Sequence, residues 1–201
     1  MAPYFICNDK YLLAFVAKTG SNSFAEAILQ RYYPKKYNST NKVRLAADGE
    51  FYHNLVPKKW HADRPVVQIF RDPVDRFKSA VAFLHYLKAC SVEEIISDLI
   101  NETNIVSKKA KKFELTQFIA PLYKNVHFQK QHQYVGLVKD IRYFRFNDQI
   151  LDAAKLLDIQ EHLQNNNRSN QAERPTLTKS QIVQIQDFYA MDMEKWESIQ
   201  D

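Results

Sequence analysis

The amino-acid sequence predicts an α/β fold, in which helices flank a parallel sheet. Two short apolar runs, residues 11–17 (YLLAFVA) and 65–70 (PVVQIF), have the composition of strands that are covered on both faces. Each run is followed by a polar turn and then by apolar residues at helical spacing. Consecutive strand-to-helix units place their strands parallel, so this repeat indicates a parallel sheet.

The first unit carries a polar loop, residues 18–23 (KTGSNS), between its strand and its helix. The apolar residues that follow are spaced as one helix face, at Phe24, Ala27, Ile28 and Tyr32. We therefore expect the loop to lead into the amino-terminal end of a helix.

The second unit turns at residues 71–73 (RDP). Asp72 suits the position that caps a helix, and Pro73 suits the first helical position, where its missing N–H costs nothing. The expected helix has one apolar face, made of Phe77, Ala80, Val81, Leu84 and Leu87.

The rest of the chain carries signals for further elements. Residues 91–94 (SVEE) and 178–181 (TKSQ) each match a capping box, so a helix is expected to begin at each. Residues 101–112 fit either a loop or an exposed helix. The remaining expected elements are strands at 134–138 and 141–146 and a helix over 148–157.

The composition is that of an ordinary globular protein. With 201 residues and 45% hydrophobic content, the chain can bury a sizeable core, and we expect a single domain over residues 1–201. The formal charge of +5 favours anionic partners, among which a nucleotide fits as well as a nucleic acid. The two cysteines, Cys7 and Cys90, lack metal-binding spacing, so neither a disulfide framework nor a zinc site is expected.

No run approaches the roughly 20 apolar residues of a membrane span, and the amino terminus lacks the pattern of a secretory signal. We therefore expect a soluble, cytoplasmic chain without a membrane segment. Nothing in the sequence indicates an oligomeric state.

The loop after the first strand has the composition of an anion-binding site. It combines the cation of Lys18 with the side-chain donors of Thr19, Ser21, Asn22 and Ser23. Backbone N–H groups at a helix start carry partial positive charge, and Gly20 permits a left-handed turn or a close approach to phosphate oxygens. The loop is not a nucleoside triphosphate loop, because G-x-x-x-x-G-K-[ST] is absent and the lysine precedes the glycine. Taken alone, it fits an ordinary polar connection equally well.

The second turn places Arg71 at the end of a strand and Ser79 eight residues later, on the following helix. Both side chains can reach one phosphate, whose oxygens match the planar fork of donors on a guanidinium group. The alternative is that Arg71 pairs with Asp75 at the helix start and that Ser79 faces solvent.

The two motifs are more informative together, because ligands of open α/β sheets bind outside the carboxyl ends of the strands. In this combination the chain resembles the sulfotransferase family. Members of that family hold a 5′-phosphosulfate with P-K-T-G-[ST]-[ST]-S and a 3′-phosphate with R-[DN]-P-x-x-R-x-x-S. The corresponding segments here are residues 17–23 (AKTGSNS) and 71–79 (RDPVDRFKS). The likeness is closer to the carbohydrate branch, the Golgi enzymes and their bacterial relatives, than to the cytosolic phenol and steroid enzymes.

Weaker matches extend this resemblance in patches from about Tyr11 to Trp196. Residues 143–147 (YFRFN) resemble the family's Y-x-R-[FY]-E segment, and residues 167–169 (NRS) resemble its late nucleotide-contacting loop. The chain departs from the family pattern at Ala17 (usually proline), Asn22 (usually a hydroxyl residue) and Asn147 (usually an acid).

The resemblance implies a P-loop-like sulfotransferase fold and a donor, 3′-phosphoadenosine 5′-phosphosulfate (PAPS), that leaves as adenosine 3′,5′-bisphosphate (PAP). Lys18 would contact the bridging oxygen, and the rest of the loop to Ser23 would cradle the phosphosulfate. Arg71 and Ser79 would hold the 3′-phosphate, and Arg168 would contact the nucleotide. The family's reaction requires no metal.

The resemblance also implies a hydroxyl-bearing acceptor, for which a saccharide is the branch's usual choice. The acceptor's base is expected within residues 48–53 (DGEFYH), where family members use a histidine or a glutamate. We favour His53 over Glu50, because a neutral imidazole is a competent base near pH 7. The alternative for His53 is an exposed loop residue.

Two other functions fit part of the pattern. A P-loop-like kinase or nucleotide hydrolase shares the strand-to-helix order, but its G-K-[ST] sequence and metal-holding acidic motif are missing. A non-catalytic nucleotide- or nucleic-acid-binding protein would use the positive charge. However, the chain lacks the aromatic-basic signature of an RNA-binding sheet and lacks a helix-turn-helix pattern. We therefore expect a nucleotide partner rather than a nucleic acid.

Overall fold

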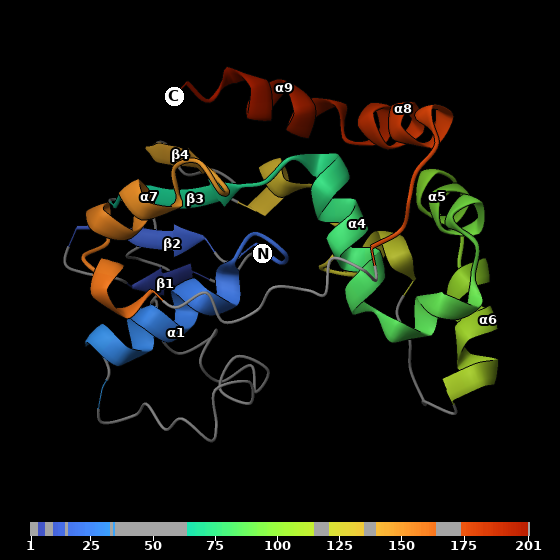
Figure 1. The fold of residues 1–201 in the computed structure, drawn as a ribbon, viewed down its shortest axis with the longest axis horizontal. Coiled ribbons are helices and arrows are strands. Elements are labelled where there is room, and N and C mark those ends of the chain that lie inside the picture. The colour runs from blue at the N-terminus through green and yellow to red at the C-terminus, as the bar shows by residue number, and fades with distance from the viewer. Residues whose placement is uncertain are drawn as a thin grey trace. The chain divides into compact units, whose positions relative to one another are not determined.

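A computed structural model of the chain describes residues 4–6, 10–14, 16–32, 34, 64–114, 121–134, 140–163 and 174–200 (Figure 1). The chain divides into two compact units, and each is described by itself. The sheet unit comprises residues 1–71, 131–167 and 198–201, and the helical unit comprises residues 72–130 and 168–197. Two chain segments thus form the helical unit, and in the sequence the first of them comes between strands β3 (Val66–Phe70) and β4 (Ile141–Arg145) of the sheet unit.

The sheet unit is built on strands in the order β1-β2-β3-β4. Their bounds are Tyr4–Ile6 for β1, Leu12–Ala14 for β2, Val66–Phe70 for β3 and Ile141–Arg145 for β4. Strands β2, β3 and β4 are parallel, which confirms the expected parallel sheet, whereas β1 pairs antiparallel with β2 and was not predicted. Strand β2 is shorter than the expected run of residues 11–17, because the chain already turns at residues 17–20.

Helices α1 (Ser21–Tyr32) and α7 (Ile150–Leu156) cover one face of this sheet (Figure 1). A short 3-10 helix, η6 (Gln160–His162), follows α7. The buried core between helices and strands contains Leu13, Phe24, Ile28, Val67, Ile69, Ala153, Ala154 and Leu157. Successive side chains of a strand point to opposite faces, so Gln68 and Phe70 lie on the other face of β3. On that face Phe70 makes an edge-to-face contact with Tyr143 of β4.

The helical unit has its own core. Its elements are α4 (Pro73–Phe83), η3 (His85–Ala89), α5 (Val92–Ile100), α6 (Ile105–Glu114), η4 (Leu122–Lys124), α8 (Lys179–Phe188) and most of α9 (Ala190–Ser198). The buried side chains that join them include Phe77, Leu87, Ile95, Leu99, Phe128, Ile185 and Tyr189. The hydroxyl of Tyr189 donates to the carbonyl of Phe128 at 2.7 Å, so this buried polar group is satisfied.

Local capping signals set where the helices of this unit begin. The Asp72 side chain accepts from the N–H of Asp75 at 2.7 Å, with Pro73 as the first helical residue, as predicted. Both expected capping boxes are present, at Ser91 with Glu94 and at Thr178 with Gln181. These short-range hydrogen bonds depend only on residues three apart, which is why the sequence reveals them.

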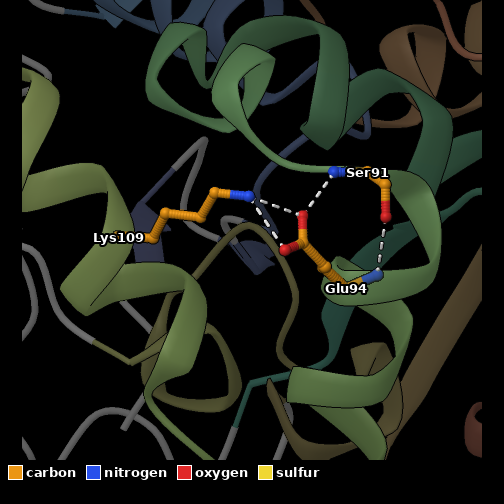
Figure 2. A network of polar contacts seen from close by, with 3 residues as sticks. All are labelled: Ser91, Glu94 and Lys109. Carbon is orange, nitrogen blue, oxygen red and sulfur yellow. Dashed lines mark hydrogen bonds and ion pairs between the residues drawn. The ribbon is translucent and has the colours of Figure 1, made fainter.

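The first capping box also connects two helices. Figure 2 shows Lys109 of α6 reaching Glu94 of α5, with Nζ at 2.8 and 3.0 Å from the two carboxylate oxygens. The hydrogen bond from Lys109 holds the pKa of the Glu94 carboxyl below its ordinary value. Residues 105–114 form helix α6, so the helical alternative for residues 101–112 is confirmed from Ile105 onward, although Val106 and Ser107 are buried.

Other expectations have mixed outcomes. The strand at 141–146 and the helix over 148–157 are confirmed as β4 and α7. The helix expected to reach Leu87 ends at Phe83 and continues as η3, and α9 was not predicted. The strand expected at 134–138 falls almost wholly outside the described residues. None of the helices in the described part of the chain has the length and apolar character needed to cross a bilayer.

Candidate functional site

The candidate site lies where three parallel strands end. The carboxyl ends of β2, β3 and β4 meet at one edge of the sheet, because the three strands run in the same direction. The turn at residues 17–20 follows β2, Arg71 follows β3, and Phe146 follows β4. The N–H of Phe146 donates to the carbonyl of Phe70 at 2.7 Å, so the hydrogen bonding between β3 and β4 continues to this edge.

The turn after β2 has a specific backbone conformation. Gly20 has a φ of 78° and Lys18 a φ of 69°, both in the left-handed region. Glycine adopts this region freely, whereas it costs an L-residue such as lysine about 1–2 kcal/mol. The hydroxyl of Thr19 donates to the carbonyl of Val16 at 2.8 Å, and Thr19 is buried. The hydroxyl proton of Thr19 is thus used in a hydrogen bond within the turn.

Helix α1 begins directly after the turn. Its first backbone hydrogen bond runs from the N–H of Phe24 to the carbonyl of Gly20 at 3.2 Å. The first turn of the helix contains no acidic residue, and Arg31 lies in its last turn. An anion is therefore favoured at the start of α1 by the helix dipole and by the N–H groups of the first turn. Ser23 is half-buried there, while the side chains of Ser21 and Asn22 are outside the described part of the structure.

Arg71 joins the two sequence motifs. Its Nη1 donates to the carbonyl of Lys18 at 3.1 Å, and its guanidinium carbon lies 4.9 Å from the centre of the Phe146 ring. Only 6% of Arg71 is exposed. The prediction that both motifs lie at the carboxyl ends of parallel strands is confirmed for Lys18 and Arg71.

Phe146 also packs against the turn. A Cβ atom added at Gly20 would lie 2.8 Å from Cε2 of the Phe146 ring, closer than real Cβ contacts come. Glycine is therefore required at position 20 both by its φ and by the ring. The Phe146 ring thus lies against both Gly20 and the Arg71 guanidinium.

The backbone of Arg71 is held by a buried glutamine. Gln131 belongs to the short 3-10 helix η5 (Gln131–Tyr134), and its side-chain amide bonds both the N–H and the carbonyl of Arg71. Gln68 of β3 donates in turn to the backbone carbonyl of Gln131 at 2.8 Å. Neither glutamine is exposed to solvent.

The remaining predicted site residues, Ser79, His53, Glu50 and Arg168, are not placed relative to this cluster. Ser79 is on α4 in the helical unit and is 2% exposed, so the alternative in which it faces solvent is wrong. The boundary between the units falls directly after Arg71, and the two residues are described separately. His53, Glu50 and Arg168 lie outside the described residues.

Sequence reasoning missed the contacts that hold Arg71 in place. Phe146 was quoted only as part of a motif, and Gln68 and Gln131 received no role. A signal existed for Gln68, which is the one polar residue in the apolar run at 65–70. Gln131 carries no comparable signal, because its contacts reach residues about sixty positions away along the chain.

Comparison of the chain with models of protein families, with curated proteins and with solved structures finds no match. The function is therefore inferred from the residues of the site. The described residues include no group of three or more His, Cys, Asp or Glu side chains placed to hold a metal ion.

We predict that Gly20→Ala destabilises the sheet unit. Alanine at a φ of 78° costs about 1–2 kcal/mol, and its Cβ also meets the Phe146 ring. Urea unfolding of the variant should give a lower free energy of unfolding than the wild type by at least this amount.

The companion variant is Phe146→Leu, which removes the ring. In that background Gly20→Ala should lower the free energy of unfolding by less than it does in the wild type, because only the cost of the left-handed backbone remains. An equal cost in both backgrounds would show that the ring does not limit position 20.

Proposed function

We propose that this chain is a sulfotransferase that takes a sulfuryl group from PAPS and transfers it to a hydroxyl acceptor. Its fold would then be the P-loop-like sulfotransferase variant of the observed α/β architecture. A saccharide is the acceptor class that the sequence resemblance favours.

The proposal rests on one observation above all, the hydrogen bond from Arg71 Nη1 to the Lys18 carbonyl at 3.1 Å. The two segments that resemble the donor-binding motifs are about fifty residues apart in sequence. The bond places the cation of the second motif directly on the backbone of the first. Parallel pairing of β2 and β3 already brings the two turns to one edge of the sheet, and the bond adds that the guanidinium of the second motif is directed at the first.

The chemistry of the turn suits a doubly anionic ligand. Lys18, Arg71 and the amino-terminal end of α1 all contribute positive potential at one edge of the sheet. No acidic side chain lies in the first turn of α1 to oppose them. We infer that the backbone N–H groups from Gly20 to Ser23 cradle the 5′-phosphosulfate.

In the proposed mechanism, the S–O bond to the donor phosphate breaks while an S–O bond to the acceptor oxygen forms. The Lys18 ammonium would stabilise the negative charge that grows on the leaving phosphate oxygen, since catalysis of such transfers is mainly positioning and charge stabilisation. Arg71 and Ser79 would hold the 3′-phosphate of the donor. The acceptor's proton would pass to His53 or Glu50.

The donor site is tested by thermal unfolding with three ligands: PAP, adenosine triphosphate and a short oligonucleotide. At about 100 times its Kd, a ligand stabilises by about 2.7 kcal/mol, so PAP should raise the Tm by roughly 5–10 °C. Arg71→Ala should abolish this shift, because it removes the guanidinium that is proposed to hold the 3′-phosphate.

Arg142 offers a matched control. Like Arg71 it is stacked on an aromatic ring, that of Tyr11, but it lies near the amino-terminal end of β4. Arg142→Ala should keep the PAP shift. Equal stabilisation by adenosine triphosphate would instead favour the kinase or hydrolase alternative, and a shift only with the oligonucleotide would favour a nucleic-acid-binding protein.

The chemical step is tested by Lys18→Ala, assayed with 35S-labelled PAPS and a panel of saccharides, phenols and lipids. Alanine is no better suited than lysine to a φ of 69°, so the change removes the ammonium without relieving the backbone. Transfer should fall about 10²–10³-fold while the Tm shift with PAP remains.

Lys10→Ala is the control for this variant, because Lys10 lies before the opposite end of the same strand β2. It should leave transfer unchanged. A Lys18→Ala enzyme with full activity would remove Lys18 from the mechanism. His53→Ala and Glu50→Gln then distinguish the two candidate bases. Only substitution of the residue that acts as the base should lower turnover without weakening PAP binding.

A further inference from the structure

Arg71 directly follows strand β3, at a point where the neighbouring strand β2 has already ended. The carbonyl of Phe70 bonds to the N–H of Phe146 on the β4 side. Backbone groups of successive strand residues point to alternate sides, so the N–H and carbonyl of Arg71 point toward β2. Strand β2 ends at Ala14, opposite Gln68, and the chain then turns away into α1. Among the described residues, β2 has therefore ended before it reaches the level of these two groups of Arg71.

The side chain of Gln131 takes the place of that missing strand. Its Oε1 accepts from the Arg71 N–H at 3.0 Å, and its Nε2 donates to the Arg71 carbonyl at 2.7 Å. A primary amide can satisfy both groups at once, because it carries a donor and an acceptor side by side. Without it, two backbone polar groups of a residue that is 6% exposed would be left without these bonds.

Gln131 is itself anchored to the sheet. The Nε2 of Gln68, in the middle of β3, donates to the Gln131 carbonyl at 2.8 Å. Both glutamines are fully buried, so the bonds are shielded from competing water. The chain also returns to the sheet unit at Gln131, directly after the segment that departs beyond Arg71. The amide thus holds together the two chain positions that flank this segment.

We propose that Gln131 is the positioning residue for Arg71, and that it sets the affinity of the site for the 3′-phosphate of the nucleotide. This inference depends on the donor site proposed above. Gln131 fixes the Arg71 backbone, while Phe146 and the Lys18 carbonyl orient the guanidinium group. A charge-assisted hydrogen bond from a guanidinium to phosphate requires this geometry, because its strength falls steeply with misalignment.

The test is calorimetric titration of Gln131→Met with PAP and with adenosine 5′-monophosphate, which lacks the 3′-phosphate. Methionine has a similar length but cannot bond the Arg71 backbone. PAP should bind about tenfold more weakly, while the 5′-monophosphate affinity should not change. In an Arg71→Ala background, Gln131→Met should have no further effect on the ratio of the two affinities.

Gln181→Met is the matched control. Gln181 is also a buried glutamine whose amide oxygen accepts from a backbone N–H, that of Thr178, but it lies in the helical unit. Its substitution should lower stability without changing the affinity ratio. If Gln131→Met does not fold, Gln131→Glu provides the test, because it keeps the shape and places an oxygen against the Arg71 carbonyl. Gln68→Met, which frees the Gln131 backbone, should change the ratio in the same direction.

The outcomes separate this inference from the proposed function. A wild-type protein that does not prefer PAP over the 5′-monophosphate contradicts the proposed donor site itself. A wild-type preference that persists in a folded Gln131 variant overturns only the positioning role. Equal losses for both nucleotides also overturn it, because they indicate a general structural effect.

Discussion

The hydrogen bond from the Arg71 guanidinium to the Lys18 carbonyl connects the ends of two parallel strands. The bond holds the Lys18 backbone on one side and orients the Arg71 guanidinium on the other. Lys18 has a left-handed backbone that costs about 1–2 kcal/mol, and a hydrogen bond to a charged group contributes about 1.5–3 kcal/mol. The free energy of this hydrogen bond is therefore sufficient to offset the cost of the left-handed backbone at Lys18.

Other contacts at this edge follow from the same constraint. The turn must leave β2 early to begin α1, which is why β2 stops at Ala14 and Arg71 needs a substitute partner. Gly20 is required because the Phe146 ring packs against the turn while also stacking on Arg71. Arg71 connects these features. Its guanidinium bonds the strained turn and stacks on the Phe146 ring, and its backbone is held by the buried amide of Gln131. Strain held in place by surrounding contacts is a frequent feature of functional sites.

The extent to which the sequence predicts this protein depends on the range of the interactions. Capping at Asp72, Ser91 and Thr178 involves neighbours three residues away, and all three helix starts were predicted. The position of Lys18 and Arg71 at the shared carboxyl edge of parallel strands was predicted from topology, whereas the hydrogen bond between them was not. The roles of Gln131 and Phe146 were not predicted, since they arise only when distant segments pack together.

The elements that were missed have similar causes. Strand β1 is three residues long and has too little sequence to show a period, and α9 follows α8 without a capping signal of its own. The helix after Arg71 ends at Phe83, although its apolar pattern continues to Leu87, because the chain tightens into a 3-10 helix that still buries Leu87. Apolar spacing thus predicts which residues are buried better than it predicts where a helix ends.

The central claim is that the turn from Lys18 into α1 binds the anionic end of a nucleotide. The chain contains three glycines, so 15N-glycine labelling gives three backbone amide signals, and Gly20 is the one preceded by threonine. Labelling threonine carbonyls with 13C therefore identifies the Gly20 signal without any substitution. We expect this signal to shift on titration with PAP and to saturate at the concentration that saturates the gain in Tm. Binding of PAP with an unmoved Gly20 signal would contradict the claim.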